Sequence, residues 1–150
     1  MIASSPRFEG RHRAAFLTEV AKILIVEDNP ANMTLAVFLL KSAGYTIVTA
    51  IDAEAGLAVA RTERPDLILM DIQLPGMDGL QATALLKGDA ATRAIPVIAL
   101  TALAMKGDEE RIRAAGCDGY IAKPLAYKEF LATVSAQLSK NGLAARPVSA

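Results

Sequence analysis

Residues 66–79 read DLILMDIQLPGMDG and place a carboxylate directly after an apolar run. The run predicts a buried strand, and Asp71 follows it without a break. Pro75 and Gly76 then mark a turn, and a second acid, Asp78, lies just beyond. An unpaired charge at the end of a buried strand costs free energy. Asp71 is therefore either a cap for the next helix or a group that reacts.

Similar apolar runs lie before and after this one, and together they predict five strands. The runs are KILIV (22–26), YTIVTA (45–50), DLILM (66–70), PVIAL (96–100) and GYIA (119–122). Three of them are nearly continuous in apolar character. Continuous runs of this kind are typical of strands covered on both faces, as in parallel sheets.

Amphipathic stretches with helix punctuation separate the runs. The first opens with Asn29-Pro30, a cap followed by proline at the first helical position, and stops at Gly44. The others are expected at 53–63, 79–88, 104–116 and 126–139. Five strands that alternate with five helices predict a doubly wound α/β domain with a parallel sheet.

The two ends of the chain differ from this alternating part. Residues 1–20 mix Ser, Pro, Gly and charge, and we expect a loose N-terminal extension in which 13–20 can form a short helix. Residues 141–150 predict a flexible tail. We therefore expect the folded domain at 21–140.

Composition narrows the class of protein. The chain has 150 residues, which suits one domain, and 53% of them are apolar, enough for a core. Sixteen basic residues balance sixteen acidic ones, so no overall field favours nucleic acid or an anionic membrane. No apolar run approaches the length of a membrane helix. The single cysteine, Cys117, cannot form an internal disulfide, and we expect a cytoplasmic protein.

Polar side chains follow four of the expected strands. Glu27 and Asp28 come after the first, Asp71 after the third, Thr101 after the fourth and Lys123 after the fifth. The carboxyl ends of parallel strands meet at one edge of the sheet, where ligands bind. If the first and third strands are neighbours, the three carboxylates converge there.

Three converging carboxylates repel one another unless a cation lies between them. A hard divalent ion such as Mg²⁺ relieves that repulsion and leaves an ionised oxygen of Asp71 free to attack. Lys123 and Thr101 are suited to hold the oxygens of a transferring phosphoryl group. An aspartate that attacks phosphorus gives an aspartyl phosphate. This reasoning favours the reactive interpretation of Asp71.

The same segments resemble a known family, the receiver domain of bacterial response regulators of the CheY type. The resemblance rests on LIVEDN (24–29), DLILMDIQLPGMDG (66–79), VIALTA (97–102) and GYIAKP (119–124), and covers roughly 21–140. It implies a flavodoxin-like (βα)5 fold with strand order 2-1-3-4-5. The C-terminal part looks closest to stand-alone receivers of polar-differentiation and cell-cycle phosphorelays, or to receivers fused to hybrid histidine kinases.

The resemblance also implies roles for individual residues. Asp71 would accept phosphate from a histidine kinase or a histidine phosphotransfer protein. The other implied roles are Mg²⁺ binding by Glu27, Asp28, Asp71 and the main-chain carbonyl of Gln73, phosphate binding by Lys123, switching by Thr101 and Tyr120, and a cis bond before Pro124. Mn²⁺ is a candidate substitute for Mg²⁺. The protein would not be an enzyme beyond slow self-catalysed phosphotransfer and dephosphorylation.

Several of these residues can also have a purely structural role. An isolated Glu27-Asp28 pair is usually a helix cap, and Tyr120 is also an ordinary sheet aromatic. We interpret Asp78 as the cap of the helix that starts near Gly79, and Cys117 as a small packing residue.

The helix at 104–116 is expected to be weakly built, because Gly107 costs it about 1 kcal/mol relative to alanine. Such a helix can shift for little energy. We expect phosphate on Asp71 to draw Thr101 inward and Tyr120 to fill the vacated space. The surface of 96–100, 104–116, 119–122 and 126–139 is expected to change with them. About ten residues follow the last helix, too few for an output domain. We expect signalling by protein–protein contact from a monomer or weak homodimer, without nucleic acid or membrane.

Two alternatives stay open. The chain can be a receiver domain cut from a hybrid histidine kinase. It can also be a phosphohydrolase of the haloacid dehalogenase type, which forms an aspartyl phosphate but needs a second aspartate two residues on, where this chain has Gln73.

Overall fold

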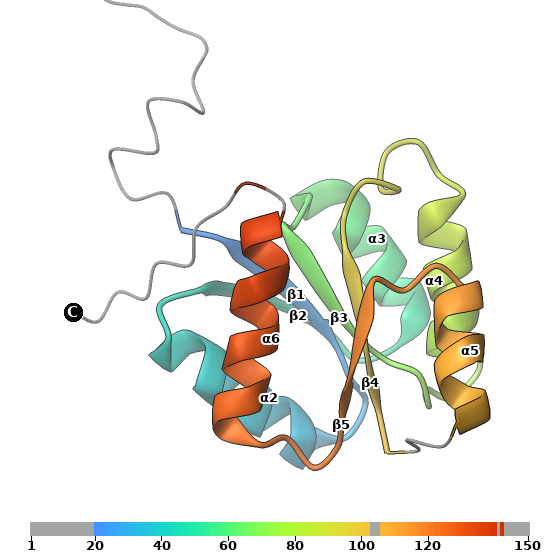
Figure 1. Cartoon of the computed structure of the whole chain (residues 1–150). Coiled ribbons are helices and arrows are strands. Elements are labelled where there is room, and N and C mark those ends of the chain that lie inside the picture. The colour runs from blue at the N-terminus through green and yellow to red at the C-terminus, as the bar shows by residue number, and fades with distance from the viewer. Residues whose placement is uncertain (1–19, 103–105, 141, 143–150) are drawn as a thin grey trace, which may run out of the picture.

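The central sheet contains five parallel strands in the order β2-β1-β3-β4-β5 (Figure 1). We describe a computed structural model that places residues 20–102, 106–140 and 142. The strands are β1 (Lys22–Val26), β2 (Thr46–Ala50), β3 (Leu67–Asp71), β4 (Val97–Thr101) and β5 (Gly119–Ala122). The expected fold class and strand order are confirmed. The expectations for 1–19, 103–105 and 143–150 lie outside the described residues.

Two strands reach one residue further than the apolar runs indicate. Asp71 and Thr101 are the last residues of β3 and β4, where we expected them just past the strand ends. Asp71 pairs with Leu100 in the register of the two strands. The ladder continues because backbone pairing does not depend on whether the side chain is polar.

Five helices lie in the described residues, at the positions that the sequence predicts to within a few residues. They are α2 (Pro30–Ser42), α3 (Ala53–Glu63), α4 (Gly79–Lys87), α5 (Lys106–Ala114) and α6 (Tyr127–Lys140). The expected cap is present at α2, where the Asn29 side chain accepts a hydrogen bond from the amide of Asn32. The α5 helix ends at Ala114, two residues before the expected Gly116, which has a positive φ of 105°.

The helices cover both faces of the sheet (Figure 1). Helices α2 and α6 pack on one face, where Leu40 and Phe130 are fully buried. Helices α3, α4 and α5 pack on the other face, which holds Ile112 and the buried Cys117. Every residue of β3 and β4 is buried, as are four of the five in β1. These three strands therefore lie between two helical layers, as their continuous apolar runs indicate.

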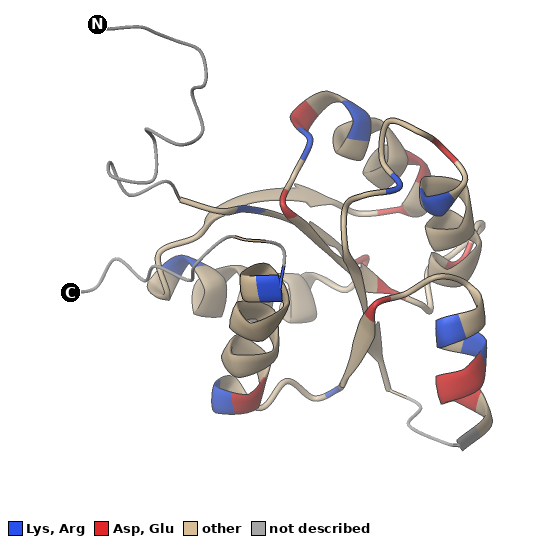
Figure 2. Cartoon of the chain, turned by 45° about the horizontal axis from the view of Figure 1, so that its top comes forward, with Lys and Arg blue, Asp and Glu red and all other residues tan. Residues whose placement is uncertain are grey.

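Helix α5 is attached to the domain by little apolar surface. Ile112 is its fully buried side chain, at 1% exposure. Ion pairs join Arg111 to Asp108 at 2.9 Å and Arg113 to Glu109 at 3.5 Å, and both arginine side chains are exposed. Figure 2 shows these charges grouped on α5. Exposed pairs contribute little to stability.

None of the helices in the described part of the chain is both long enough and apolar enough to cross a membrane.

Candidate functional site

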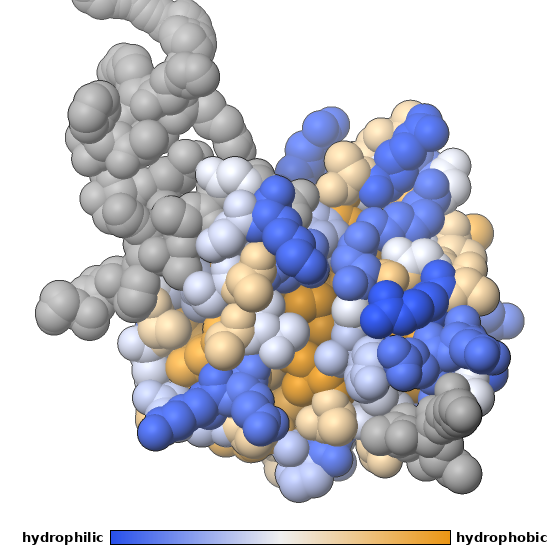
Figure 3. Space-filling view, viewed as in Figure 1, coloured by the Kyte–Doolittle hydropathy of each residue, from blue (hydrophilic) through white to orange (hydrophobic). Residues whose placement is uncertain are grey.

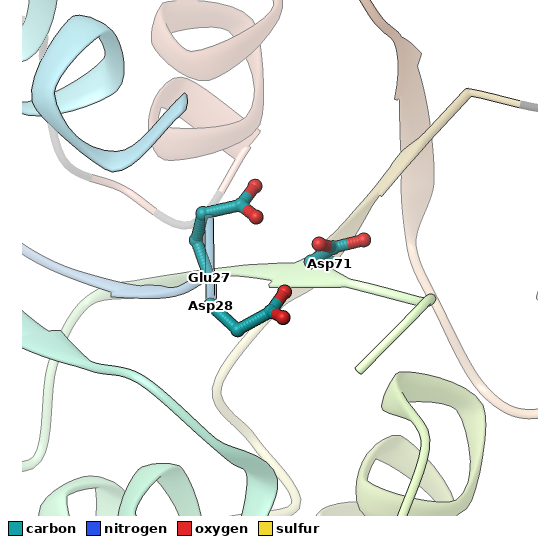
Figure 4. A group of neighbouring side chains, drawn as sticks. All are labelled: Glu27, Asp28 and Asp71. Atoms are coloured by element: carbon teal, nitrogen blue, oxygen red, sulfur yellow. The ribbon is translucent and has the colours of Figure 1, made fainter. Parts of the chain in front are cut away.

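Three acids meet at the carboxyl edge of the sheet, as expected from the sequence. Glu27 and Asp28 follow β1, and Asp71 ends β3, the strand that pairs with β1. One carboxylate oxygen from each lies within 4.8 Å of the others, and Figure 4 shows the three side chains side by side. Glu27 is 2% exposed and Asp71 3%, whereas Asp28 is exposed. The site is therefore a buried acidic pair with a third acid on its solvent side.

Lys123 supplies a positive charge to two of these acids. Its ammonium nitrogen donates to Oε1 of Glu27 at 2.8 Å and lies 3.2 Å from Oδ2 of Asp71. The Lys123 amide donates to the carbonyl of Thr101 at 2.8 Å, which holds the segment after β5 against the end of β4. The bond from Lys123 to Pro124 is cis, as the family resemblance implies.

Protonation at the site follows from burial and from these close charges. Burial raises the pKa of Glu27, and the neighbouring Asp71 carboxyl raises it further, against the opposing effects of Lys123 and the Asn29 amide. Burial by itself lowers the pKa of Lys123, but the hydrogen bond to Glu27 and the charge of Asp71 outweigh it, so the pKa is raised. Lys123 is therefore protonated at neutral pH.

The loop after β3 orients the Asp71 carboxylate. The amide of Gln73 donates to Oδ1 of Asp71 at 2.9 Å, so Oδ2 is the oxygen that faces Lys123. Asp78 lies at the other end of this loop and caps α4, where it forms a capping box with Gln81 at 2.8 and 3.0 Å. The interpretation of Asp78 as a cap is therefore confirmed.

Thr101 and Tyr120 occupy β4 and β5 near this edge. Thr101 is fully buried at the end of β4, one residue beyond the partner of Asp71. Tyr120 is half-buried and pairs with Ala99, two residues before Thr101. The side chain of Tyr120 packs against the core under α3, α4 and α5. The structure thus brings Glu27, Asp28, Asp71 and Lys123 together and leaves Tyr120 further along the sheet.

The sequence did not predict two backbone amides that donate hydrogen bonds to the acids of the site. The amide of Asn29 donates to Oε2 of Glu27 at 3.1 Å, and the amide of Gln73 donates to Asp71. We expected Asn29 only as a helix cap and Gln73 only through its carbonyl. Because every residue except proline carries a backbone amide, the residue type holds no signal for this role.

The donor set suits a hard divalent cation. Carboxylate oxygens are the ligands that Mg²⁺ takes in proteins, and three lie within reach of a single ion. Glu27 already accepts two hydrogen bonds, from Asn29 and Lys123. Of the three acids, Asp28 is the one whose side chain is exposed to solvent.

Comparison with known proteins gives consistent results. Residues 23–135 match the family described as response regulator receiver domain. The chain is 51% identical over 116 residues to the polar-differentiation response regulator DivK of Brucella anthropi, covering 77% of this chain and 94% of that protein. The DivK of Brucella ovis is 50% identical over the same length and coverage.

Solved structures show the same fold. One is the receiver domain of a sensor histidine kinase from Pseudomonas aeruginosa, with a magnesium ion coordinated in its active-site cleft. It is 37% identical, has a TM-score of 0.75, and covers 81% of this chain and 99% of its own. The chemotaxis protein CheY4 of Vibrio cholerae is 27% identical, also with a TM-score of 0.75, over 79% of this chain and 98% of its own.

Proposed function

The chain belongs to the response regulator receiver domain family, and from this premise we propose that Asp71 accepts the phosphoryl group through which it signals. It is a homologue of DivK and a receiver of two-component signalling. The observation that most supports Asp71 is the position of its carboxylate, within 4.8 Å of two other acids and 3.2 Å from the ammonium group of Lys123. We propose 21–140 as the bounds of the receiver domain, and cytoplasmic location stays a prediction.

The proposed reaction transfers a phosphoryl group from a phosphohistidine of a kinase or phosphotransfer protein. An ionised carboxylate oxygen of Asp71 forms a bond to phosphorus while the bond from phosphorus to the imidazole nitrogen breaks. The electron pair stays on that nitrogen. The other nitrogen of the ring carries a proton, so the donor histidine leaves as neutral imidazole. Lys123 lies 3.2 Å from Asp71 Oδ2, close enough to contact the phosphoryl oxygens and stabilise their charge.

We propose that Glu27, Asp28 and Asp71, together with the main-chain carbonyl of Gln73, hold Mg²⁺. When bound, the ion supplies positive charge that neutralises the phosphoryl oxygens during transfer. Mn²⁺ takes the same oxygen donors and is proposed as a substitute.

Saturating Mg²⁺ should stabilise the folded protein. An ion that binds only the folded state at a hundred times its Kd adds about 2.7 kcal/mol to the free energy of unfolding. The measurement is urea unfolding with MgCl₂ and with NaCl of equal ionic strength. Asp28→Asn should lose most of this increment, because Asp28 is a proposed ligand and is exposed, so its loss disturbs little packing. If Mg²⁺ raised the free energy of unfolding of the variant as much as that of the wild type, Asp28 would not be a ligand.

A hollow of about 400 Å³ on the α5–β5–α6 face is the proposed site for a downstream protein. Gly119 and Tyr120 line it from β5, Arg113 from α5, and Ala136 from α6. Figure 3 shows hydrophobic residues at its floor, between the two helices. An apolar floor with a charged rim is typical of a protein-binding surface. We propose output by protein contact from a monomer or weak homodimer, without nucleic acid.

Thr101→Ala should uncouple phosphorylation from this surface. We propose that the phosphoryl group draws the Thr101 hydroxyl inward and that Tyr120 fills the vacated space, which favours a minor state of α5. The variant should still take up phosphate on Asp71, but its affinity for the downstream protein should rise less than tenfold on phosphorylation. Calorimetry on phosphorylated and unphosphorylated protein measures this. A wild-type response in the variant would overturn the coupling.

Labelling with acetyl phosphate tests the proposed function directly. We expect stoichiometric, Mg²⁺-dependent addition of phosphate that hydroxylamine removes, and no turnover of p-nitrophenyl phosphate. Sustained turnover of the ester would instead support the phosphohydrolase alternative. Phosphotransfer from a panel of histidine kinases then identifies the donor. The panel includes hybrid kinases, which carry a fused receiver, because the other alternative is a receiver domain cut from such a kinase.

A further inference from the structure

Gly79, the first residue of α4, lies directly against the backbone that carries Asp71. A Cβ atom added to Gly79 would overlap the carbonyl oxygen of Asp71 and lie 2.7 Å from Cα of Ile72. The Gly79 amide donates to the carbonyl of Ile72 at 3.2 Å across the same contact. The helix can therefore approach the end of β3 this closely only because residue 79 has no side chain.

Neither partner in this contact can move away at low cost. On the strand side, the Ile72 amide donates to the carbonyl of Leu100 at 3.2 Å, and the Ile72 side chain is 7% exposed. On the helix side, Ala82 is fully buried, and the buried Thr83 hydroxyl donates to the carbonyl of Gly79 at 2.8 Å. Close-packed interiors transmit such a displacement and do not absorb it.

The segment that would be displaced is the one that arranges the site. The peptide bond from Asp71 to Ile72 lies between the Asp71 side chain and the amide of Gln73, which holds that carboxylate at 2.9 Å. A shift of this peptide moves the carboxylate and its hydrogen-bond donor together, and the Gln73 carbonyl with them.

We propose that Gly79 is a positioning residue for the Asp71 site: its missing side chain sets the distance between α4 and β3, and thereby the placement of the Asp71 carboxylate and the Gln73 peptide. This inference rests on the proposed function. Other glycines show the contrast. The atoms nearest to a Cβ at Gly56 belong to the Val26 side chain, the first at 2.8 Å, and a Cβ at Gly107 would meet nothing within 4 Å.

The test compares Gly79→Ala with two variants that leave this contact intact. Gly107→Ala adds the same methyl group to α5 in open space. Asp78→Ala removes the cap of α4 and so weakens the same helix end without adding an atom near Asp71. For each protein we would measure the Mg²⁺ Kd by calorimetry, the rate of labelling by acetyl phosphate, and unfolding in urea.

Gly79→Ala is expected to raise the Mg²⁺ Kd and lower the labelling rate, each by roughly tenfold or more, as for other changes that displace ligands indirectly. Asp78→Ala should destabilise the protein but keep both values within about twofold, an order-of-magnitude bound for a helix cap remote from the ion. The proposal is overturned if Gly79→Ala and Asp78→Ala lose Mg²⁺ affinity and labelling rate equally. It is also overturned if Gly79→Ala loses neither.

Two further outcomes are distinguishable. If Gly79→Ala fails to fold, the same measurements are made on the double variant Gly79→Ala/Gly107→Ala, because alanine at residue 107 stabilises α5. A double variant that still does not fold would show that Gly79 is needed for folding, and it would overturn the positioning role. A wild-type chain that takes up neither Mg²⁺ nor phosphate would refute the proposed function itself, whereas an intact wild type with an unaffected Gly79→Ala refutes only this inference.

Discussion

Asp71→Asn is expected to abolish covalent labelling of the chain by acetyl phosphate. The amide oxygen of asparagine is a far weaker nucleophile toward phosphorus than an ionised carboxylate, so no acyl phosphate forms. The variant should fold, because asparagine has the same shape and its oxygen can still accept from the Gln73 amide, 2.9 Å away in the wild type. Intact-protein mass spectrometry after incubation with acetyl phosphate and Mg²⁺ measures the result.

Asp78→Asn is the matched control for this substitution. It makes the same chemical change at the other end of the same loop, where the side chain caps α4. Asparagine caps helices about as well as aspartate, so stability should change little. We expect labelling at the wild-type level in this control. Retained labelling in Asp71→Asn would place the phosphoryl group on another residue.

Lys123→Ala is expected to have the second-largest effect, on both reactivity and stability. Without the ammonium group, the phosphoryl oxygens lose their protein-borne positive charge, and labelling should slow by about 10²–10³-fold. In the absence of Mg²⁺, Glu27 and Asp71 lose the cation that lies 2.8 and 3.2 Å from them. Removing one partner of a buried ion pair costs about 3 kcal/mol. Mg²⁺ should restore part of this stability but little of the rate.

Lys87→Ala separates the two effects. Lys87 is also partly buried and pairs with Asp118 at 3.1 Å, but it lies near the amino ends of β4 and β5, at the opposite edge of the sheet. Its loss should lower the free energy of unfolding and leave the labelling rate unchanged. Kinetics of labelling and urea unfolding on both variants provide the comparison. Equal slowing in both would mean that Lys123 acts only through stability.

Much of this fold can be read from local patterns in the chain. The continuous apolar runs at β1, β3 and β4 indicate strands buried on both faces, and all three are. Asn29 and Asp78 indicate helix starts, and both cap the helices that follow. These features depend on a residue and its near neighbours in sequence, which is why periodicity and capping rules detect them.

The residue types of the site were also readable, because the motifs around Asp71 and Lys123 resemble those of a known family. The resemblance, not the apolar pattern, supplied the strand order 2-1-3-4-5. Periodicity describes how each strand is buried but not which strand lies beside it. The pairing of β1 with β3, which brings Glu27 and Asp71 together, is such a non-local contact.

The sequence by itself determined the alternation of strands and helices, the caps, and which acids and which lysine stand at the strand ends. Only the tertiary structure decided that Lys123 contacts Glu27 as well as Asp71, that backbone amides of Asn29 and Gln73 hold the two buried acids, and that α4 rests on the Asp71 backbone at Gly79. The physical reason is that burial and capping are set by neighbours along the chain. Distances between side chains from different strands follow instead from the packing of the whole domain.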